Sequence, residues 1–139
     1  MIKIDDFRAE HREIASLMDR FAAMLAAETP PEPLAFLQFR REFGRVLNQH
    51  LKREDWTLYP HLMASPRPEV RGVAQRLHAE IGAFEAAFGA YARCWTSVRI
   101  CENWELFREE SEALIRRLQH RILVEEQELY PLVERRAAA

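Results

Sequence analysis

Proline and glycine, which interrupt helices, are confined to a few places in this chain, and that distribution restricts the possible folds most. The seven prolines fall at positions 30, 31, 33, 60, 66, 68 and 131, and only four glycines occur. The segments between them carry apolar residues every three or four positions, which is the period of an amphipathic helix. No segment shows a convincing alternation of polar and apolar residues. The sequence therefore predicts an all-α protein.

Four long helices are predicted, over about residues 5–27, 33–63, 69–97 and 103–136. The first should begin at a capping Asp5 or Asp6, and the last at Asn103. Pro60 is expected to bend or unwind the last turn of the second helix. Four amphipathic helices joined by short connectors fold most simply as an antiparallel up-down-up-down four-helix bundle, in which the apolar faces meet in the centre.

The length of the chain fits one domain, which we expect to span residues 1–136. The alanine-rich tail at residues 137–139 has nothing large to bury and should fray. The two cysteines, Cys94 and Cys101, are too few for a disulfide scaffold. We expect them to be small buried side chains or free thiols.

Charge and hydropathy exclude several kinds of partner. The 20 basic and 22 acidic side chains give a net charge of -2, and the arginines are scattered among glutamates, so we expect no nucleic acid partner. No apolar run approaches the roughly 20 residues that span a bilayer, so we expect no membrane partner. The polar N-terminal segment is unlike a signal peptide, which favours a cytoplasmic location.

A weak internal repeat brings histidines and carboxylates onto the predicted inward faces of the helices. The segment at residues 50–60 returns at residues 120–131, and in both a glutamate stands five residues before a tyrosine. One histidine precedes each copy, His11 in the first half and His78 in the second. Such residues need a partner in a core, because an unpaired buried polar group costs about 1–3 kcal/mol.

Coordination of a metal ion can satisfy these groups, because imidazoles and carboxylates are good metal ligands. His50 and Glu54 are four residues apart, so they share one face of a helix. His120 and Glu125 are five residues apart, which turns them away from each other on a regular helix. We therefore expect a π-type bulge or a bent turn between these two residues.

The neighbouring polar residues have simpler explanations. Asp55 and Glu126 lie about 100° around the helix from the inward carboxylates, so we expect them on a solvated face, in salt bridges. Tyr59 and Tyr130 each precede a proline, and aromatic packing with helix termination explains them better than a redox role. His61 is expected on the surface.

The spacing excludes ferritin-like di-iron bundles, because their Glu-x-x-His signature is absent from the chain. What remains is His-x3-Glu on the second predicted helix, His-x4-Glu on the fourth, and single histidines on the first and third. This pattern resembles the hemerythrin-like (HHE cation-binding) family over nearly the whole chain. The residues that carry the resemblance are His11, His50, Glu54, His78, His120 and Glu125, with the Leu-Tyr-Pro triplets at 58–60 and 129–131.

The resemblance implies a cofactor of two non-heme iron ions, joined by an oxo or hydroxo bridge and by the carboxylates of Glu54 and Glu125. The histidines of the first half, His11 and His50, would bind one iron. The two histidines of the second half would bind the other.

One position departs from the oxygen-carrying members of that family. They have a second histidine one turn after the residue that corresponds to His78, and this chain has Gly82 there. Glycine ligates nothing, so the second iron should keep an extra open position. Glu85 is a candidate to replace the missing ligand, and His61 is a weaker candidate.

We therefore expect a di-iron protein that binds dioxygen or a related small ligand, such as nitric oxide or peroxide, for sensing, scavenging or storage. An enzyme that turns over peroxide or nitric oxide is the alternative that Gly82 favours. A helical interaction module, free of metal or stabilised by it, is a third hypothesis. Its protein partner would bind exposed apolar residues such as Trp56 or Trp95.

Overall fold

The structure is a computed structural model that describes residues 2–135. All regular elements in this part of the chain are helices, which confirms the all-α prediction. In chain order, with η marking a π-helical segment, they are α1 (Ile4–Leu25), α2 (Pro33–Arg53), η1 (Glu54–Leu58), α3 (Tyr59–Met63), α4 (Pro68–Ile81), α5 (Phe84–Cys94), α6 (Ser97–Glu102), α7 (Trp104–Val124), η2 (Glu125–Leu129) and α8 (Tyr130–Glu134). The predicted domain end at residue 136 and the predicted frayed tail at 137–139 lie outside the described residues.

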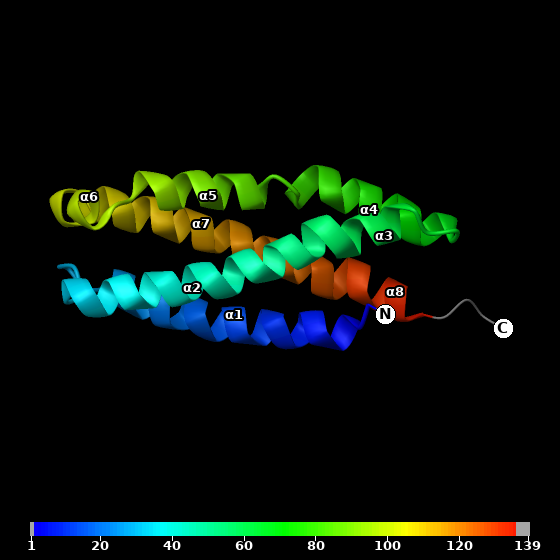
Figure 1. The fold of residues 1–139 in the computed structure, drawn as a ribbon, viewed down its shortest axis with the longest axis horizontal. Coiled ribbons are helices and arrows are strands. Elements are labelled where there is room, and N and C mark those ends of the chain that lie inside the picture. The colour runs from blue at the N-terminus through cyan, green and yellow to red at the C-terminus, as the bar shows by residue number, and fades with distance from the viewer. Residues whose placement is uncertain (1, 136–139) are drawn as a thin grey trace.

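The helices form four rod-like segments, called lengths below, that lie side by side along the long axis of the molecule (Figure 1). The first length is α1, the second runs from α2 to α3, the third from α4 to α5, and the fourth from α7 to α8. The short helix α6 lies at one end of the molecule, whereas the N-terminus and α8 lie at the other. Because α1 contacts both α2 and α7, and α4 contacts η2, side chains from all four lengths can meet in the centre.

Local sequence explains where the first two helices begin. Pro33 stands in the first turn of α2, where its missing N–H is not needed, and the Glu32 carboxylate accepts hydrogen bonds from two backbone N–H groups of that turn. The N-cap of α1 is Lys3 rather than either predicted aspartate. Asp5 and Asp6 lie instead in the first turn, where the helix dipole stabilises negative charge.

A π-helical turn stands before each Tyr-Pro pair. η1 ends immediately before Tyr59 and Pro60, and η2 ends immediately before Tyr130 and Pro131. A proline ring inside a regular helix clashes with the carbonyl group four residues earlier, and a wider turn relieves that crowding. Of the two predicted effects of Pro60, bending or unwinding, the structure excludes unwinding, because the helix continues beyond Pro60 as α3, and it shows the π turn η1 in front of the proline.

The third predicted helix is broken in the structure. α4 ends at Ile81, and Gly82 and Ala83 form a turn before α5. Glycine has a low helix propensity, which favours a break at this position. The sequence does not predict α6, which follows an N-cap at Thr96 whose hydroxyl accepts a backbone N–H of the first turn. Asn103 is the N-cap residue of α7, as predicted.

Apolar side chains form two separate clusters in the core. The larger cluster is rich in aromatic rings, among them Phe21, Phe43 and Phe107. The smaller cluster includes Phe7 and Leu77. The fully buried Phe107 ring has centroid distances of 5.3 to 6.2 Å to five aromatic neighbours, namely Phe21, Phe36, Tyr91, Trp95 and Trp104.

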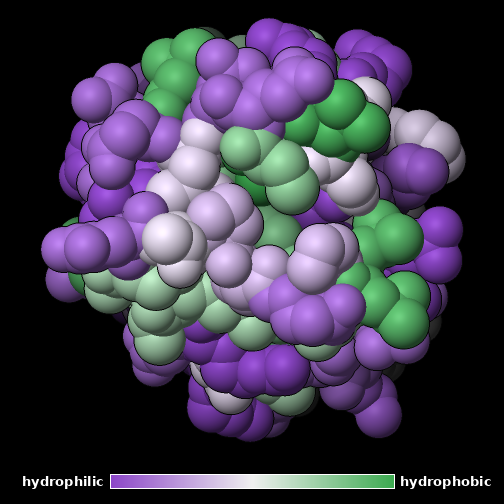
Figure 2. Space-filling model, turned by 90° about the vertical axis from the view of Figure 1, so that its left-hand side faces the viewer, coloured by the Kyte–Doolittle hydropathy of each residue, from purple (hydrophilic) through white to green (hydrophobic). Residues whose placement is uncertain are grey.

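The surface carries apolar side chains in separate places. At the end of the molecule where α6 lies, apolar areas are divided by polar ones (Figure 2). The large exposed apolar residues in the described part of the chain are Leu34, Trp56, Val98, Leu106 and Leu123. Trp95 is only 1% exposed and its indole N–H donates to Glu110, so the prediction that it is available to a partner is wrong. Both cysteines are free and exposed.

We expect Phe107→Ala to lower the free energy of unfolding by about 3–5 kcal/mol, because it leaves a cavity among five aromatic rings. The neighbouring Leu106→Ala is the control, since Leu106 is 46% exposed and its truncation leaves no cavity. Urea unfolding followed by circular dichroism measures both values. Equal losses for the two variants would contradict the assigned core.

Candidate metal centre

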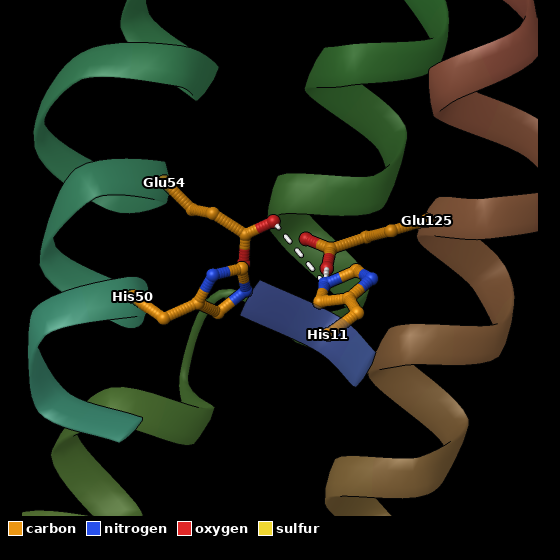
Figure 3. A group of neighbouring side chains, drawn as sticks. All are labelled: His11, His50, Glu54 and Glu125. Carbon is orange, nitrogen blue, oxygen red and sulfur yellow. Dashed lines mark ion pairs between the residues drawn. The ribbon is translucent and has the colours of Figure 1, made fainter. Parts of the chain in front are cut away.

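Four side chains meet in the core and present metal-ligating atoms to one another. His11 comes from α1, His50 from α2, Glu54 from the first position of η1, and Glu125 from the first position of η2. Their ligating atoms lie within 4.8 Å of one another, and all four residues are buried. Figure 3 shows both imidazoles and both carboxylates directed toward a common centre.

The group lies between the two apolar clusters of the core. Along α1, His11 stands between Phe7 of the smaller cluster and Ile14 of the larger one. Along α2 and η1, the boundary between the clusters falls between Leu51 and Leu58. Apolar layers on both sides therefore keep water away, which strengthens every electrostatic interaction inside the group.

Two atoms of the group are buried without a hydrogen-bond partner. His50 Nε2 lies 3.0 Å from Glu54 Oε1, and His11 Nε2 lies 3.2 Å from Glu125 Oε1. Despite this proximity, His50 Nε2 and Glu125 Oε1 make no hydrogen bond. Leaving such atoms unsatisfied costs about 1–3 kcal/mol each, and a cation coordinated by both would satisfy them together. The residues present therefore fit a metal ion.

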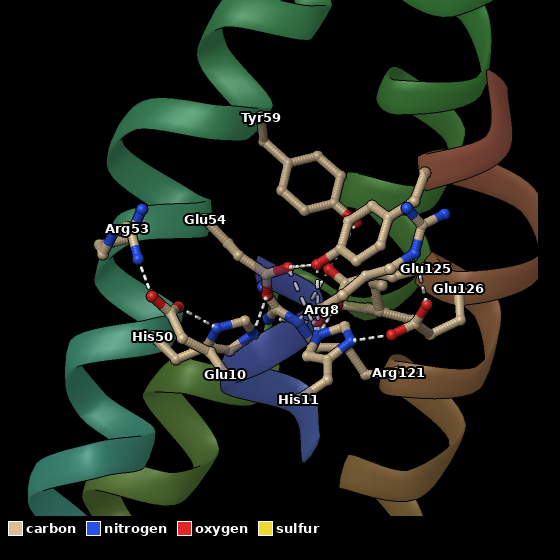
Figure 4. A network of polar contacts seen from close by, with 12 residues as sticks. Arg8, Glu10, His11, His50, Arg53, Glu54, Tyr59, Arg121, Glu125 and Glu126 are labelled. Carbon is tan, nitrogen blue, oxygen red and sulfur yellow. Dashed lines mark hydrogen bonds and ion pairs between the residues drawn. The ribbon is translucent and has the colours of Figure 1, made fainter. Parts of the chain in front are cut away.

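The outer nitrogen of each imidazole is held by a further carboxylate (Figure 4). His50 Nδ1 lies 2.6 Å from Glu10 Oε1, and His11 Nδ1 lies 2.9 Å from Glu126 Oε1. A carboxylate accepts a proton-bearing nitrogen, so Nδ1 carries the hydrogen and the Nε2 lone pair faces the centre. Metal-binding histidines are usually oriented in this way. Glu126, expected on a solvated face, therefore orients a histidine of the centre.

The outer carboxylates have their own cations. Arg53 pairs with Glu10. Arg8 lies 3.3 Å from Glu126 and also donates to Glu134 at 2.7 Å. Its hydrogen bond to Glu134 raises the pKa of Arg8, and the charge of Glu126 adds to this effect. Both outer carboxylates thus have an arginine partner without the metal, and Glu126 shares its arginine with Glu134.

Two tyrosines cross over to hold the inner carboxylates. Tyr59 donates to Glu125 Oε2 at 2.9 Å, and Tyr130 donates to Glu54 Oε2 at 2.7 Å. Burial, followed by the negative charge of the nearby carboxylates, raises the pKa of both phenols, so they stay protonated donors. The sequence explanation of packing and helix termination misses these hydrogen bonds, because nothing in the spacing reveals a contact between distant helices.

A buried arginine completes the group. Arg121 Nη2 lies 3.1 Å from Glu54 Oε1 and 2.8 Å from Asp55 Oδ1. Its Nε lies 3.5 Å from Glu125 Oε2, and its Nη1 donates to the backbone carbonyl of Ile81 at 3.4 Å. Burial alone would lower the pKa of Arg121, but the neighbouring carboxylates outweigh burial and raise it. Arg121 is thus a permanent cation inside the core.

The two inner carboxylates differ in acidity. Burial alone would raise the pKa of Glu54, but the nearby His50 and Arg121 outweigh it and lower that pKa below its ordinary value. Burial raises the pKa of Glu125, and the negative charge of Glu54 raises it further. Of the two, Glu125 is therefore the carboxylate that more easily holds a proton when no metal ion is bound.

The structure does not bring the other two predicted histidines into the group. His120 is exposed and lines a surface cavity of about 420 Å³ together with Arg116 and Arg117. His78 is half-buried and packs against Tyr59, with ring centroids 5.6 Å apart. The set of six predicted ligands thus separates into four that meet and two that lie elsewhere.

The π turn of the last helix lies after Glu125 and not before it, so the prediction of a bulge between His120 and Glu125 is wrong. α7 is regular through Val124, and η2 begins at Glu125. Five residues of regular helix turn His120 away from the centre. Arg121, four residues before Glu125, faces the centre instead.

The two residues considered as replacement ligands also lie outside the group. His61 is exposed, as predicted. Glu85 lies on α5, beyond the break at Gly82. Asp55, expected in a surface salt bridge, pairs with the buried Arg121.

The fold and the site together define an all-helical protein with a buried histidine and carboxylate centre that can hold a metal ion. A family comparison agrees with this description. The model of the hemerythrin family, described as the hemerythrin HHE cation binding domain, matches residues 2–133. The chain belongs to this family, which confirms the resemblance found in the sequence. No curated protein and no solved structure matches the chain.

A separate finding concerns membranes. Within residues 2–135, no helix is both long enough and apolar enough to cross a bilayer.

Removal of the carboxylate that orients His50 should weaken metal binding. We expect Glu10→Ala to lower the affinity for ferrous iron about 10–100-fold, because His50 loses the acceptor that fixes its proton on Nδ1. Glu13→Ala is the matched control, since Glu13 lies on the same helix and is exposed. Competition with a coloured chelator under anaerobic conditions measures both affinities. An unchanged affinity of Glu10→Ala would show that this contact does not orient a ligand.

Proposed function

We propose that this chain is a non-heme iron protein that binds dioxygen or a related small ligand, such as nitric oxide or peroxide, for sensing, scavenging or storage. His11, His50, Glu54 and Glu125 would hold the iron. Ferrous iron, when bound, supplies the electrons and the open coordination position that such ligands require.

The observation that carries this proposal is a pair of buried atoms without a hydrogen-bond partner, His50 Nε2 and Glu125 Oε1, on two of the four side chains that meet in the core. Two histidines with carboxylates also suit ferrous iron, since two histidines and one carboxylate bind it in non-heme oxygenases. Membership in the hemerythrin family supports the same class of ligand.

The side chains around the centre would prepare it for a small ligand. The apolar clusters on both sides exclude water. The hydroxyl group of Tyr130 lies 3.2 Å from His11 Nε2 as well as 2.7 Å from Glu54 Oε2, so it can hold a proton beside the ligands. Its raised pKa keeps that proton in place at neutral pH.

We also propose the topology and location predicted from the sequence. An antiparallel up-down-up-down four-helix bundle is supported by the contacts of α1 with α2 and α7 and by the parallel lengths in Figure 1. The cytoplasmic location expected from the sequence stays a prediction.

Nitric oxide tests the proposed function. We expect the anaerobic ferrous protein to show a saturable absorption change on titration with nitric oxide, and the change should reverse when the gas is removed. His50→Ala should abolish the change, because it removes an iron ligand, whereas exposed Gln49→Ala should retain it.

The time course separates the two functional hypotheses. A stable, reversible change supports binding for sensing, scavenging or storage. Decay of the change with consumption of nitric oxide or peroxide assigns the chain to the enzyme alternative. A folded protein that takes up no iron would refute both and leave the helical interaction module.

A further inference from the structure

The two halves of the molecule repeat with a constant spacing, and this spacing gives every residue of the centre a counterpart. Glu54 and Glu125 are 71 positions apart, and so are Tyr59 and Tyr130. Each tyrosine donates its hydrogen bond to the glutamate of the other half. The repeat is therefore one of structure as well as of sequence.

The same spacing matches the two histidines of the centre to residues that are not histidines. The counterpart of His50 is Arg121, and the counterpart of His11 is Gly82. His50 and Arg121 each stand four residues before an inner glutamate and each contact it. One half of the centre thus offers two imidazoles, whereas the other offers a guanidinium and a residue without a side chain.

The guanidinium contacts the two carboxylates that would bridge a pair of irons. Arg121 lies 3.1 Å from Glu54 and 3.5 Å from Glu125, and it is 1% exposed. A second metal ion bound to these oxygens on the same side would meet a permanent positive charge. It would also lack nitrogen ligands, because His78 and His120 lie outside the group.

The backbone around Gly82 leaves no room for a metal-ligating side chain and helps to hold Arg121. A Cβ atom at Gly82 would lie 2.4 Å from the His78 carbonyl oxygen, so a larger residue does not fit this turn. The carbonyl of the preceding Ile81 accepts a hydrogen bond from Arg121. The break between α4 and α5 therefore contributes to holding the guanidinium.

The charges of the inner group balance with one metal ion. Glu54, Asp55 and Glu125 carry three negative charges when ionised, and Arg121 carries one positive charge. One divalent ion neutralises the remainder. A second divalent ion would leave an excess of positive charge in a core that contains apolar layers on both sides, which is costly.

We propose that the Arg121 guanidinium takes the place of a second metal ion, so that this chain binds one ion where its resemblance to the hemerythrin-like family implies two. The inference rests on the proposed function, because it concerns the same metal centre. It assigns the single ion to the half of the centre that contains His11 and His50.

Counting metal ions tests the inference. The chain is loaded anaerobically with ferrous iron, and separately with cobalt(II), freed of excess metal, and examined by native mass spectrometry. We expect one ion per chain in the unaltered protein. His78→Ala and His120→Ala should also keep one ion, because neither histidine belongs to the group, whereas His50→Ala should lose it.

The variant Arg121→His tests directly whether Arg121 occupies the position of a second metal ion. We expect this variant to take up a second ion, because it removes the guanidinium and adds an imidazole at the counterpart of His50. Arg45→His is the matched control, since it adds a histidine at an exposed position of α2 and should stay at one ion.

Several outcomes overturn the inference. Two ions in the unaltered protein, or loss of an ion in His120→Ala, would show that the second site exists despite Arg121. One ion in a folded Arg121→His variant would show that Arg121 does not occupy a metal position. If Arg121→His does not fold, the number of ions bound by the unaltered protein and by His120→Ala still tests the inference. No ion at all in the unaltered protein refutes the proposed function instead.

Discussion

Two carboxylates buried side by side, those of Glu54 and Glu125, impose the strongest constraint on this structure. An ionised carboxylate removed from water is stable only when cations and hydrogen-bond donors surround it. The side chains around the pair meet this requirement from every direction. Tyr59 and Tyr130 donate to one oxygen of each carboxylate, and Arg121 supplies a positive charge that cannot be lost. Three buried atoms in and around the pair still lack a hydrogen-bond partner, namely His50 Nε2, Glu125 Oε1 and Arg121 Nε.

The same local backbone structure occurs in both halves of this arrangement. In each half, a glutamate opens a π turn that ends just before a Tyr-Pro pair. The proline makes the regular helix unfavourable at that point. A wider turn between glutamate and tyrosine, which are five residues apart in the sequence, lets the helix continue without a break. Because each tyrosine reaches the glutamate of the other half, the two π turns stabilise each other. Among the residues that face the carboxylates, the symmetry breaks where His50 and His11 are matched by Arg121 and Gly82.

The sequence predicts much of this structure, and the failures have physical causes. Helical periodicity identifies the lengths of helix. Residue type and spacing select six side chains, of which four meet in the structure. Aligning His120 with His50 in the internal repeat requires a one-residue gap. That alignment does not hold in the structure, because one residue turns a helical side chain by about 100°. Without the gap, the residue aligned with His50 is Arg121. From the sequence alone, the charge of an arginine makes a buried position unexpected. Glu10 gives no signal, because its contact with His50 joins two helices.

An arginine and a metal ion stabilise a buried carboxylate pair in different ways. A metal ion can leave, and its ligands must then gain protons or water, whereas a guanidinium is covalently part of the chain and stays charged. In the metal-free protein, Arg121 still forms ion pairs with Glu54 and Asp55, which helps to hold that side of the centre in place. The histidine side alone then changes with metal content. When a bound ion exchanges, the ion pairs of Arg121 would therefore continue to hold the helices together.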